Sequence, residues 1–357
     1  MEMILELAGA LVAQAQKPTL AFLIGGMVLA ALSSRLEVPE AIYKWIVMLL
    51  LLKVGMSAGI SVREADLAAL AVPALGAAVI GVAIVLLGSV TIARLRGVAH
   101  ADAMATAGLF GAVSAATLAA GMAMLDAEGI AYEGFIGALY PFMDVPALVT
   151  AIVLGRLAAE RRAARAGSAQ GGVVVLGGGG SGGGGGGSGL APGLLRAILL
   201  DTLRSPAISA LLLGLALGLL ARPESVYEGF YEPLFRGLLS VLMLIMGFEA
   251  WARLSEMRKV AFAYVLYGLA APFVHGALGL AVGVLAHQIT GFSLGGVVLL
   301  AVMAASSSDI SGPPTLRGAL PEANPSAYVG TSTGIGTPVA ILSIPFWIWA
   351  AGALIGG

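Results

Sequence analysis

The chain has 357 residues, of which 59% are hydrophobic and only 11% charged, and its mean hydropathy is +0.98. Soluble domains carry about 25% charged residues, so this composition excludes an ordinary soluble protein. The formal net charge of −1 argues against a nucleic-acid partner, and the absence of cysteine excludes disulfides, thiolate metal sites and iron–sulfur clusters. We expect an all-α polytopic membrane protein.

Ten apolar stretches are each long enough to cross a hydrocarbon core of about 30 Å. In chain order, these predicted spans are residues 18–34, 39–60, 66–93, 101–125, 134–157, 200–221, 232–252, 259–286, 292–319 and 326–353. The residues before them, MEMILELAGALVAQAQ, are acidic and have no basic n-region. We therefore expect a short interfacial helix there rather than a cleavable signal peptide.

The two halves of the chain resemble each other. PTLAFLIGGMVLAAL (18–32) parallels PAISALLLGLALGLL (206–220), and DVPALVTAI (144–152) parallels GTPVAILSI (336–344). The offsets of 188 and 192 residues indicate one five-span repeat that occurs twice. Because five is an odd number, the second copy must enter the membrane from the opposite side, as in the inverted repeats of many secondary transporters.

The repeats are joined by a Gly/Ser-rich stretch, which is typical of a flexible coil. We predict a first five-helix repeat over residues 1–160, a flexible linker over 161–193 and a second, inverted repeat over 194–357. Gly214 and Gly218 within the second repeat have the spacing of a helix-packing motif, although this signal has low specificity.

Basic residues set the predicted orientation, because they collect in loops that face the cytoplasm. They are concentrated in and beside the odd-numbered loops, and the largest group surrounds the linker: Arg156, Arg161, Arg162, Arg165, Arg196 and Arg204. The odd-numbered loops and the linker should therefore be cytoplasmic, and both termini should lie on the outer, periplasmic side.

Spans four and nine occupy equivalent places in the two repeats, and both carry residues that interrupt a helix. Span four contains GLFGAVSAATLAAG (108–121) and span nine contains AASSSDISGPPTLRG (304–318). Irregular backbone at membrane depth is tolerated only where protein buries it or where it lines a watery cavity. Paired interruptions of this kind predict broken helices that form a transport site.

Each interruption is followed by a short helix that a serine could cap. Ser114 precedes AATLAA, and Ser311 precedes GPPTLRG, where proline suits the first helical turn. A helix N-terminus offers free N–H donors and a charge of roughly +0.5, so it attracts anions. Two such ends could hold a small oxyanion without a lysine or arginine at either interruption.

Asp309 would repel an anion at this place unless a cation lay between them. Na⁺ prefers oxygen ligands, and hydroxyls are abundant in Ser306–Ser308 and in GTSTGIGTP (330–338), which contains Thr331, Ser332, Thr333 and Thr337. Blander interpretations stay open at this stage. A membrane serine often bonds the preceding helical turn, and Asp309 could cap a helix facing a cytoplasmic vestibule. Asp144 could be an accessory ligand, pair with Lys53 or face a cavity.

Several long segments identify the closest family resemblance. GLFGAVSAAT, LYPFMDVPALV, RPESVYEGFYEPLFRGLLS, AASSSDISGPPTLRG and NPSAYVGTSTGIGTPVAI resemble the cyanobacterial SbtA family of sodium-dependent bicarbonate transporters. The resemblance runs from about Lys17 to Pro345, interrupted by the linker. It implies a core domain with crossed broken helices, a gate domain, a homotrimer in the inner membrane and a role in concentrating CO₂. It also implies a cytoplasmic partner like SbtB, a PII-like regulatory protein.

The resemblance also implies ligands at matching positions. Bicarbonate contacts would come from Gly111, Ser114, Ala115, Ala116, Thr117, Ser306, Ser307 and Ser308. Sodium contacts would come from Asp309, Ser308, Thr333 and Thr337, with Asp144 as a possible accessory residue. One departure is VSAAT at the first interruption, where the family pattern is closer to VSGST. Backbone N–H groups, Ser114 and Thr117 would then have to carry that part of the anion contact.

Together these features predict high-affinity Na⁺/HCO₃⁻ symport by an elevator-like movement of the core against the gate. No Walker loop, HExxH or GxSxG motif is present, so we expect no enzyme activity, and no cofactor other than Na⁺ as the coupling ion. Two alternatives stay open: a transporter of another small anion or organic acid, and a bicarbonate-sensing membrane scaffold that does not transport.

Overall fold

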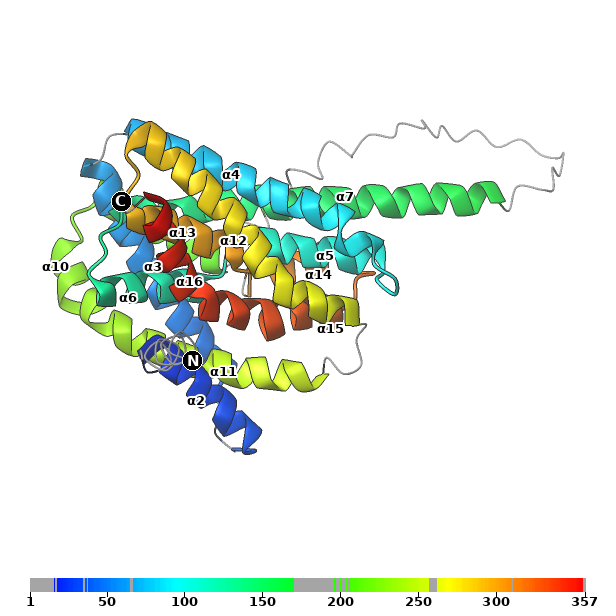
Figure 1. Ribbon diagram of the computed structural model, residues 1–357, viewed down its shortest axis with the longest axis horizontal. Coiled ribbons are helices and arrows are strands. Elements are labelled where there is room, and N and C mark those ends of the chain that lie inside the picture. Colours follow the sequence, from blue (N-terminus) through cyan, green and yellow to red (C-terminus); the bar gives the residue numbers. More distant parts are fainter. Residues whose placement is uncertain are drawn as a thin grey trace, which may run out of the picture.

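The computed structural model describes residues 16, 18–34, 36, 38–64, 67–169, 196, 200, 203–204, 206–256, 262–309 and 311–355. Every regular element within these ranges is helical (Figure 1). The interfacial helix predicted at the start of the chain, and the predicted linker from residue 170 onward, lie outside the described residues.

The helices follow the predicted order of apolar spans. In the first half they are α2 (Pro18–Ala31), α3 (Glu40–Glu64), α4 (Leu67–Val90), the 3₁₀ helix η1 (Ile92–Arg94), α5 (His100–Gly111), α6 (Ala115–Glu128), the 3₁₀ helix η2 (Gly134–Ala138) and α7 (Leu139–Ala169). In the second half they are α9 (Pro206–Leu220), α10 (Glu224–Val226), the π-helix η3 (Tyr227–Tyr231), α11 (Glu232–Glu256), α12 (Phe262–Thr290), α13 (Leu294–Ala305), α14 (Gly312–Ala319), α15 (Pro325–Val329), the π-helix η5 (Gly330–Gly336) and α16 (Thr337–Ile355).

Seven helical stretches in the described part of the chain are long and apolar enough to cross a membrane. They are Glu40–Arg63, Leu70–Arg94, His100–Glu128, Gly134–Ala159, Glu224–Ala252, Phe262–Thr290 and Pro325–Ile355. Three shorter apolar helices, Pro18–Ala31, Ile208–Leu220 and Leu294–Ala305, lie where the sequence predicts spans one, six and nine. The chain is therefore a multi-pass helical membrane protein.

The C-terminal end of α7 differs from the prediction. The sequence places the end of span five at residue 157 and the start of a flexible linker at residue 161, yet α7 continues to Ala169. Residues 158–167 read AAERRAARAG, and alanine, arginine and glutamate are among the strongest helix formers. In Figure 1 this end of α7 projects beyond the other helices, on the side of the molecule where α14 and α15 lie.

Four helices, α2, α3, α9 and α11, form a group that we call the four-helix group. Within it α2 packs along α11, and glycines bring the two backbones into direct contact. A Cβ atom added to Gly26 would lie 2.2 Å from the carbonyl oxygen of Leu244, and one added to Gly247 would lie 2.1 Å from that of Leu23. Only glycine allows this approach.

The same kind of contact joins α3 to α9. A Cβ atom on Gly55 would lie 2.2 Å from the carbonyl oxygen of Leu211, and one on Gly214 would lie 2.5 Å from that of Leu52. Gly218 is equally close to Met56, which confirms the packing role predicted for this glycine pair. Each half of the chain thus contributes one helix to each of the two pairs.

The other long helices form a larger group, in which α12 packs along α13 and α4 packs along both α5 and α7. The two groups meet where α3 contacts η2, where α11 contacts η5, and where both α3 and α11 contact α6. Helix α6 therefore lies at the boundary between the groups.

Candidate functional site

Helix α5 ends at Gly111, and three residues separate it from α6. Ala112 is extended, with φ −95° and ψ 156°, and Ser114 is extended with φ −88° and ψ 122°. The Ser114 hydroxyl accepts a hydrogen bond of 3.1 Å from the Thr117 N–H, which confirms Ser114 as the N-cap of α6. We call residues 112–114 the first interruption.

Gly111 has a packing role in the last turn of α5. An added Cβ atom would lie 2.9 Å from the carbonyl oxygen of Gly81 on α4 and 2.9 Å from the Cβ atom of Ala147 on α7. The glycine therefore lets α5 approach both neighbouring helices closely. These packing contacts are sufficient to explain why residue 111 is a glycine, and no ligand is needed to explain it.

A second interruption separates α13 from α14 at residues 306–311. Ser306 is extended, with φ −74° and ψ 176°, and ends α13. Ser311 occupies the N-cap position of α14, but its hydroxyl makes no capping bond, so the predicted side-chain cap is wrong. Instead the Gly312 N–H donates to the hydroxyl of Ser308 at 3.0 Å. The chain bends so that Ser308, rather than Ser311, reaches the free N–H group of Gly312 at the start of α14.

The two interruptions contact each other directly. The Ser114 N–H donates to the Ser306 hydroxyl at 3.0 Å, and the Ser308 N–H donates to the carbonyl oxygen of Leu109 at 2.8 Å. The Ser306 hydroxyl in turn donates to Met303 in the last turn of α13. These serines are all fully buried. The N-terminus of α6 is thus held against the second interruption.

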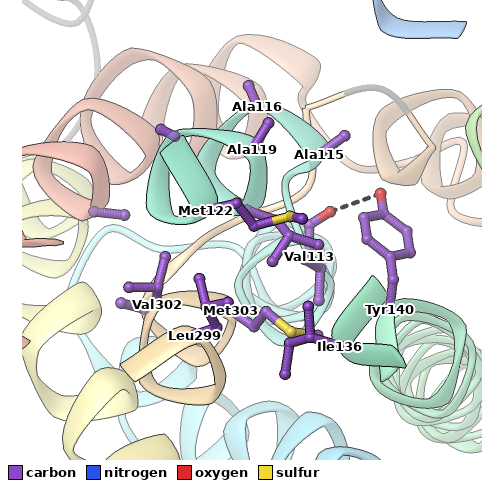
Figure 2. Packing of buried hydrophobic residues seen from close by; sticks show 14 of the residues in the cluster. Val113, Ala115, Ala116, Ala119, Met122, Ile136, Tyr140, Leu299, Val302 and Met303 are labelled. Carbon is purple, nitrogen blue, oxygen red and sulfur yellow. Dashed lines mark hydrogen bonds between the residues drawn. The ribbon is translucent and has the colours of Figure 1, made fainter. Parts of the chain in front are cut away.

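Asp144 on α7 joins the same two segments. Its Oδ1 atom accepts from the Val113 N–H at 2.9 Å, and its Oδ2 atom accepts from the Ser311 hydroxyl at 3.2 Å. The Ser311 oxygen also lies 3.0 Å from that of Ser308. One helical turn before Asp144, the Tyr140 hydroxyl donates to the Val113 carbonyl at 2.9 Å (Figure 2). Because Asp144 is fully buried, its carboxylate fixes the relative position of both interruptions.

Lys53 does not pair with Asp144. Its ammonium nitrogen lies 4.4 Å from the centre of the Phe235 ring and 5.6 Å from that of Tyr227, a cation–π arrangement within the four-helix group. Among the described residues no carboxylate lies within ion-pair distance of this lysine. The pairing considered from the sequence is therefore wrong, and Lys53 contributes to packing between α3 and the start of α11.

An apolar layer supports the interruptions from the side of the larger group. Met122 of α6, Leu299 and Val302 of α13, and Ile136 of η2 belong to one buried cluster with Val113 (Figure 2). Each of these side chains is 2% exposed or less. Such packing restricts the movement of α6 relative to α13, so the polar groups beside it keep a defined geometry.

The π-helix η5 lies against the second interruption. The Ser307 oxygen is 3.2 Å from that of Thr337 and donates to the Ser332 carbonyl at 3.3 Å. The Ser332 hydroxyl donates to the Ser308 carbonyl, also at 3.3 Å. π-Helical segments frequently occur at functional sites, because the extra residue per turn leaves backbone groups free. The predicted hydroxyl-rich segment and the serine run are therefore adjacent.

Two hydroxyls at this place have no hydrogen-bond partner among the described residues: those of Thr117 and Thr333. Thr117 is fully buried and Thr333 is 4% exposed. Buried polar groups are nearly always satisfied, and leaving one unsatisfied costs about 1–3 kcal/mol. Each hydroxyl thus has a hydrogen-bonding capacity that the described residues leave unused. Ala115 and Ala116 add only the first backbone N–H groups of α6.

Asp309 lies at the edge of this cluster and is only partly buried. Its Oδ2 atom is 3.5 Å from the hydroxyl of Tyr43 on α3, so it faces the four-helix group. The Ser114 side chain and Glu249 of α11 also lie close to it. The sequence does not point to Tyr43, because a single tyrosine in an apolar span gives no indication of the residue that it contacts in the fold.

A groove of about 720 Å³ opens beside this edge, between the α2–α3 connection and the end of α11, and Glu40 and Glu249 line it. The described residues contain no group of three or more His, Asp or Glu side chains of the kind that holds a transition metal. Hydroxyls, carbonyls and one carboxylate are instead suited to a hard monovalent cation.

The model of the Na⁺-dependent bicarbonate transporter superfamily matches residues 18–352, nearly the whole chain. No curated protein matches the chain significantly.

Proposed function

This chain belongs to the Na⁺-dependent bicarbonate transporter superfamily, and we propose that it imports bicarbonate by high-affinity Na⁺/HCO₃⁻ symport where the two interruptions meet. The observation that carries the proposal is the buried bond between Ser114 and Ser306, which holds the N-terminus of α6 against a run of serines. A transporter family, rather than an enzyme family, also agrees with a helical membrane chain.

Bicarbonate would bind at the N-terminus of α6. The free N–H groups of Ala115 and Ala116 point out of the first turn, and the helix end carries a partial charge of roughly +0.5. The unpartnered Thr117 hydroxyl can donate a further hydrogen bond, and the Ser306 hydroxyl lies at the same end of the helix, with Ser307 and Ser308 next to it in the chain. Because dipoles and no cationic side chain would hold the anion, the anion would be able to dissociate again.

Na⁺ travels as the second substrate and would bind beside the anion. Asp309, Ser308, Thr333 and Thr337 are the oxygen donors that we assign to it. The unpartnered Thr333 hydroxyl supports this assignment, as does the position of Asp309 at the edge of the serine cluster. Neither ion would bind well alone, because Asp309 repels the anion and the α6 N-terminus repels the cation. This mutual dependence is the physical basis for coupling.

We infer that the ten apolar segments form two inverted five-span repeats, with α5/α6 and α13/α14 as broken spans. Residues 114 and 306, which bond each other, are 192 positions apart, which equals one of the two repeat offsets. The glycine contacts follow the same relation: Gly26 corresponds to Gly214, and Gly55 to Gly247. The four-helix group would act as the gate domain and the larger group as the core, which moves like an elevator.

We place the chain in the inner membrane with both termini outside, as the distribution of basic residues and the family resemblance favour. The groove at Glu249 would then open to the cytoplasm. By the same resemblance we propose a homotrimer that serves CO₂ concentration and binds an SbtB-like PII protein on its cytoplasmic face. The projecting end of α7 lies on that face and is accessible to a partner.

Replacement of Asp309 by asparagine tests the assignment. Uptake of radiolabelled bicarbonate into proteoliposomes should require a severalfold higher Na⁺ concentration for half-maximal rate in D309N. The matched control is D102N, because the Asp102 carboxylate is likewise enclosed by helices but accepts from Tyr264 and Asn324, away from the interruptions. An unchanged Na⁺ dependence in D309N would sink the assignment. Uptake of acetate in preference to bicarbonate would favour an organic-acid transporter on the same scaffold.

A further inference from the structure

A separate cavity of about 160 Å³ lies at the opposite end of α6 from the interruptions, between α2, α6 and α11. A water molecule occupies about 30 Å³ in the liquid, so the cavity has room for a small ion with part of its hydration shell. It is too small for a larger organic substrate. Like the interruptions, it lies at the boundary between the four-helix group and α6.

Arg236 of α11 is the one charged residue among those that line this cavity. Within the described part of the chain it forms no hydrogen bond or ion pair. A guanidinium group presents two parallel N–H donors that match the O–C–O edge of a carboxylate-like anion, and bicarbonate has the same edge. A guanidinium without a described protein partner at the wall of a small cavity therefore favours a planar oxyanion.

Other groups at the cavity limit the strength of such binding. The Thr19 hydroxyl has no described partner and can donate, whereas the Ser240 hydroxyl already donates to Gly237 at 2.7 Å. The C-terminal carbonyls of α6 carry partial negative charge near Ala127, which opposes an anion. Arg236 is also exposed. Attraction by Arg236 and the Thr19 hydroxyl is thus opposed by the helix carbonyls and by solvent. This balance predicts weak, rapidly reversible binding, which would let a substrate move on to a tighter site.

One face of α6 connects the cavity to the first interruption. Ala116, Ala120, Ala123 and Ala127 are three or four residues apart, so they lie along one side of the helix. Ala123 and Ala127 line the cavity, while Ala116 and Ala120 are fully buried. At 1.5 Å per residue, Ala116 and Ala123 are about 10 Å apart. This face is buried over Ala116 and Ala120, and α6 contributes only methyl groups to it at these four positions.

We propose that this cavity is an outer entry subsite for a small carboxylate-like oxyanion, which Arg236 receives before the alanine face of α6 opens toward the interruptions. The identity of the anion as bicarbonate, and the outer position, rest on the proposed function. The subsite itself depends on neither Asp309 nor Na⁺. Its role is to raise the local anion concentration at the gate–core boundary.

The experiment compares R236Q with R222Q, which removes the same charge from an exposed loop residue near the same end of α11. Proteoliposome uptake of radiolabelled bicarbonate should show a KM about tenfold higher in R236Q, the lower end of electrostatic steering. The maximal rate and the half-saturating Na⁺ concentration should not change. The difference should shrink when choline chloride raises ionic strength at constant Na⁺. R222Q should match the unsubstituted protein.

A second variant keeps the test decisive if R236Q folds poorly. R236K retains the charge without the two-pronged donor geometry, so its KM should fall between those of R236Q and the unsubstituted protein. Equal KM values for R236Q and R222Q would overturn the proposal. A lower maximal rate at unchanged KM would also overturn it, because that result marks a structural residue. Failure of the proposed function is distinct, since it would appear as Na⁺-independent uptake in the unsubstituted protein.

Discussion

The backbone contact between α2 and α11 predicts a large difference between two adjacent glycines. A Cβ atom on Gly26 would lie 2.2 Å from the carbonyl oxygen of Leu244, whereas one on Gly25 would meet nothing within 4 Å. Because a carbon atom normally stays at least about 3.3 Å from a carbonyl oxygen, G26A must separate the helices by about 1 Å. Rigid backbone on both sides leaves no side chain that could move away.

Overpacking of this kind costs about 1–3 kcal/mol, of which roughly 1 kcal/mol is offset by the higher helix propensity of alanine. Because both sides of this contact are backbone, we take the upper end of that range, about 3 kcal/mol, so the net loss for G26A is near 2 kcal/mol. For a chain of 357 residues this corresponds to a fall in Tm of about 3 °C. G25A should keep or slightly raise Tm. G214A should behave like G26A, since its Cβ atom would lie 2.5 Å from the Leu52 carbonyl oxygen, at the position that the proposed repeat makes equivalent to Gly26.

The assay is thermal unfolding of purified protein in one detergent, followed by a dye-free fluorescence or aggregation signal. If G26A melts within a degree of G25A, the direct backbone contact between α2 and α11 is refuted. If G26A is destabilised and G214A is not, the contact survives but the equivalence of the two repeats in the four-helix group does not.

Three further substitutions test other contacts. T333V removes a hydroxyl without a described partner, so it should not lower stability but should raise the half-saturating Na⁺ concentration. T331V is the control, because its hydroxyl donates to Ala327 at 2.7 Å. It should cost about 1 kcal/mol in thermal unfolding and leave the Na⁺ dependence of uptake unchanged. R63Q loses hydrogen bonds to the Gly218 and Ala221 carbonyls and the ion pair with Glu224, so thermal unfolding should show a loss of about 1 kcal/mol at this partly exposed site; an unchanged Tm would contradict this role. Y43F removes the hydroxyl that faces Asp309 and competes with Na⁺, so uptake assays should show a lower half-saturating Na⁺ concentration, and a higher one would mean that Tyr43 assists cation binding.

The sequence predicts those features of the fold that depend on local chemistry. Seven of the predicted apolar spans, the N-cap at Ser114 and the packing of Gly214 and Gly218 all follow from neighbouring residues, and the described part of the structure has them. The end of α7 was also encoded locally, in AAERRAARAG, but the glycine-rich stretch after it drew the predicted boundary too early.

Features that depend on the path of the chain in space could not be predicted in the same way. Four serines surround the second interruption, and only the bend of the backbone decides that Ser308, not Ser311, caps α14. Asp144 reaches partners 31 and 167 residues away, and Tyr43 meets Asp309 across 266 residues. Such long-range pairs follow from packing, which no short sequence pattern specifies.

The central claim is that Na⁺ and bicarbonate move together, and simultaneous flux of both ions tests it most directly. Proteoliposomes with equal bicarbonate on both sides would receive an inward Na⁺ gradient, with radiolabelled sodium and radiolabelled bicarbonate followed in parallel at a pH where little CO₂ is present. The account predicts accumulation of bicarbonate above its external concentration, Na⁺ entry that stops when bicarbonate is removed, and loss of both fluxes in D309A. Bicarbonate entry at the same rate in choline, or Na⁺ entry that continues without bicarbonate, would contradict it.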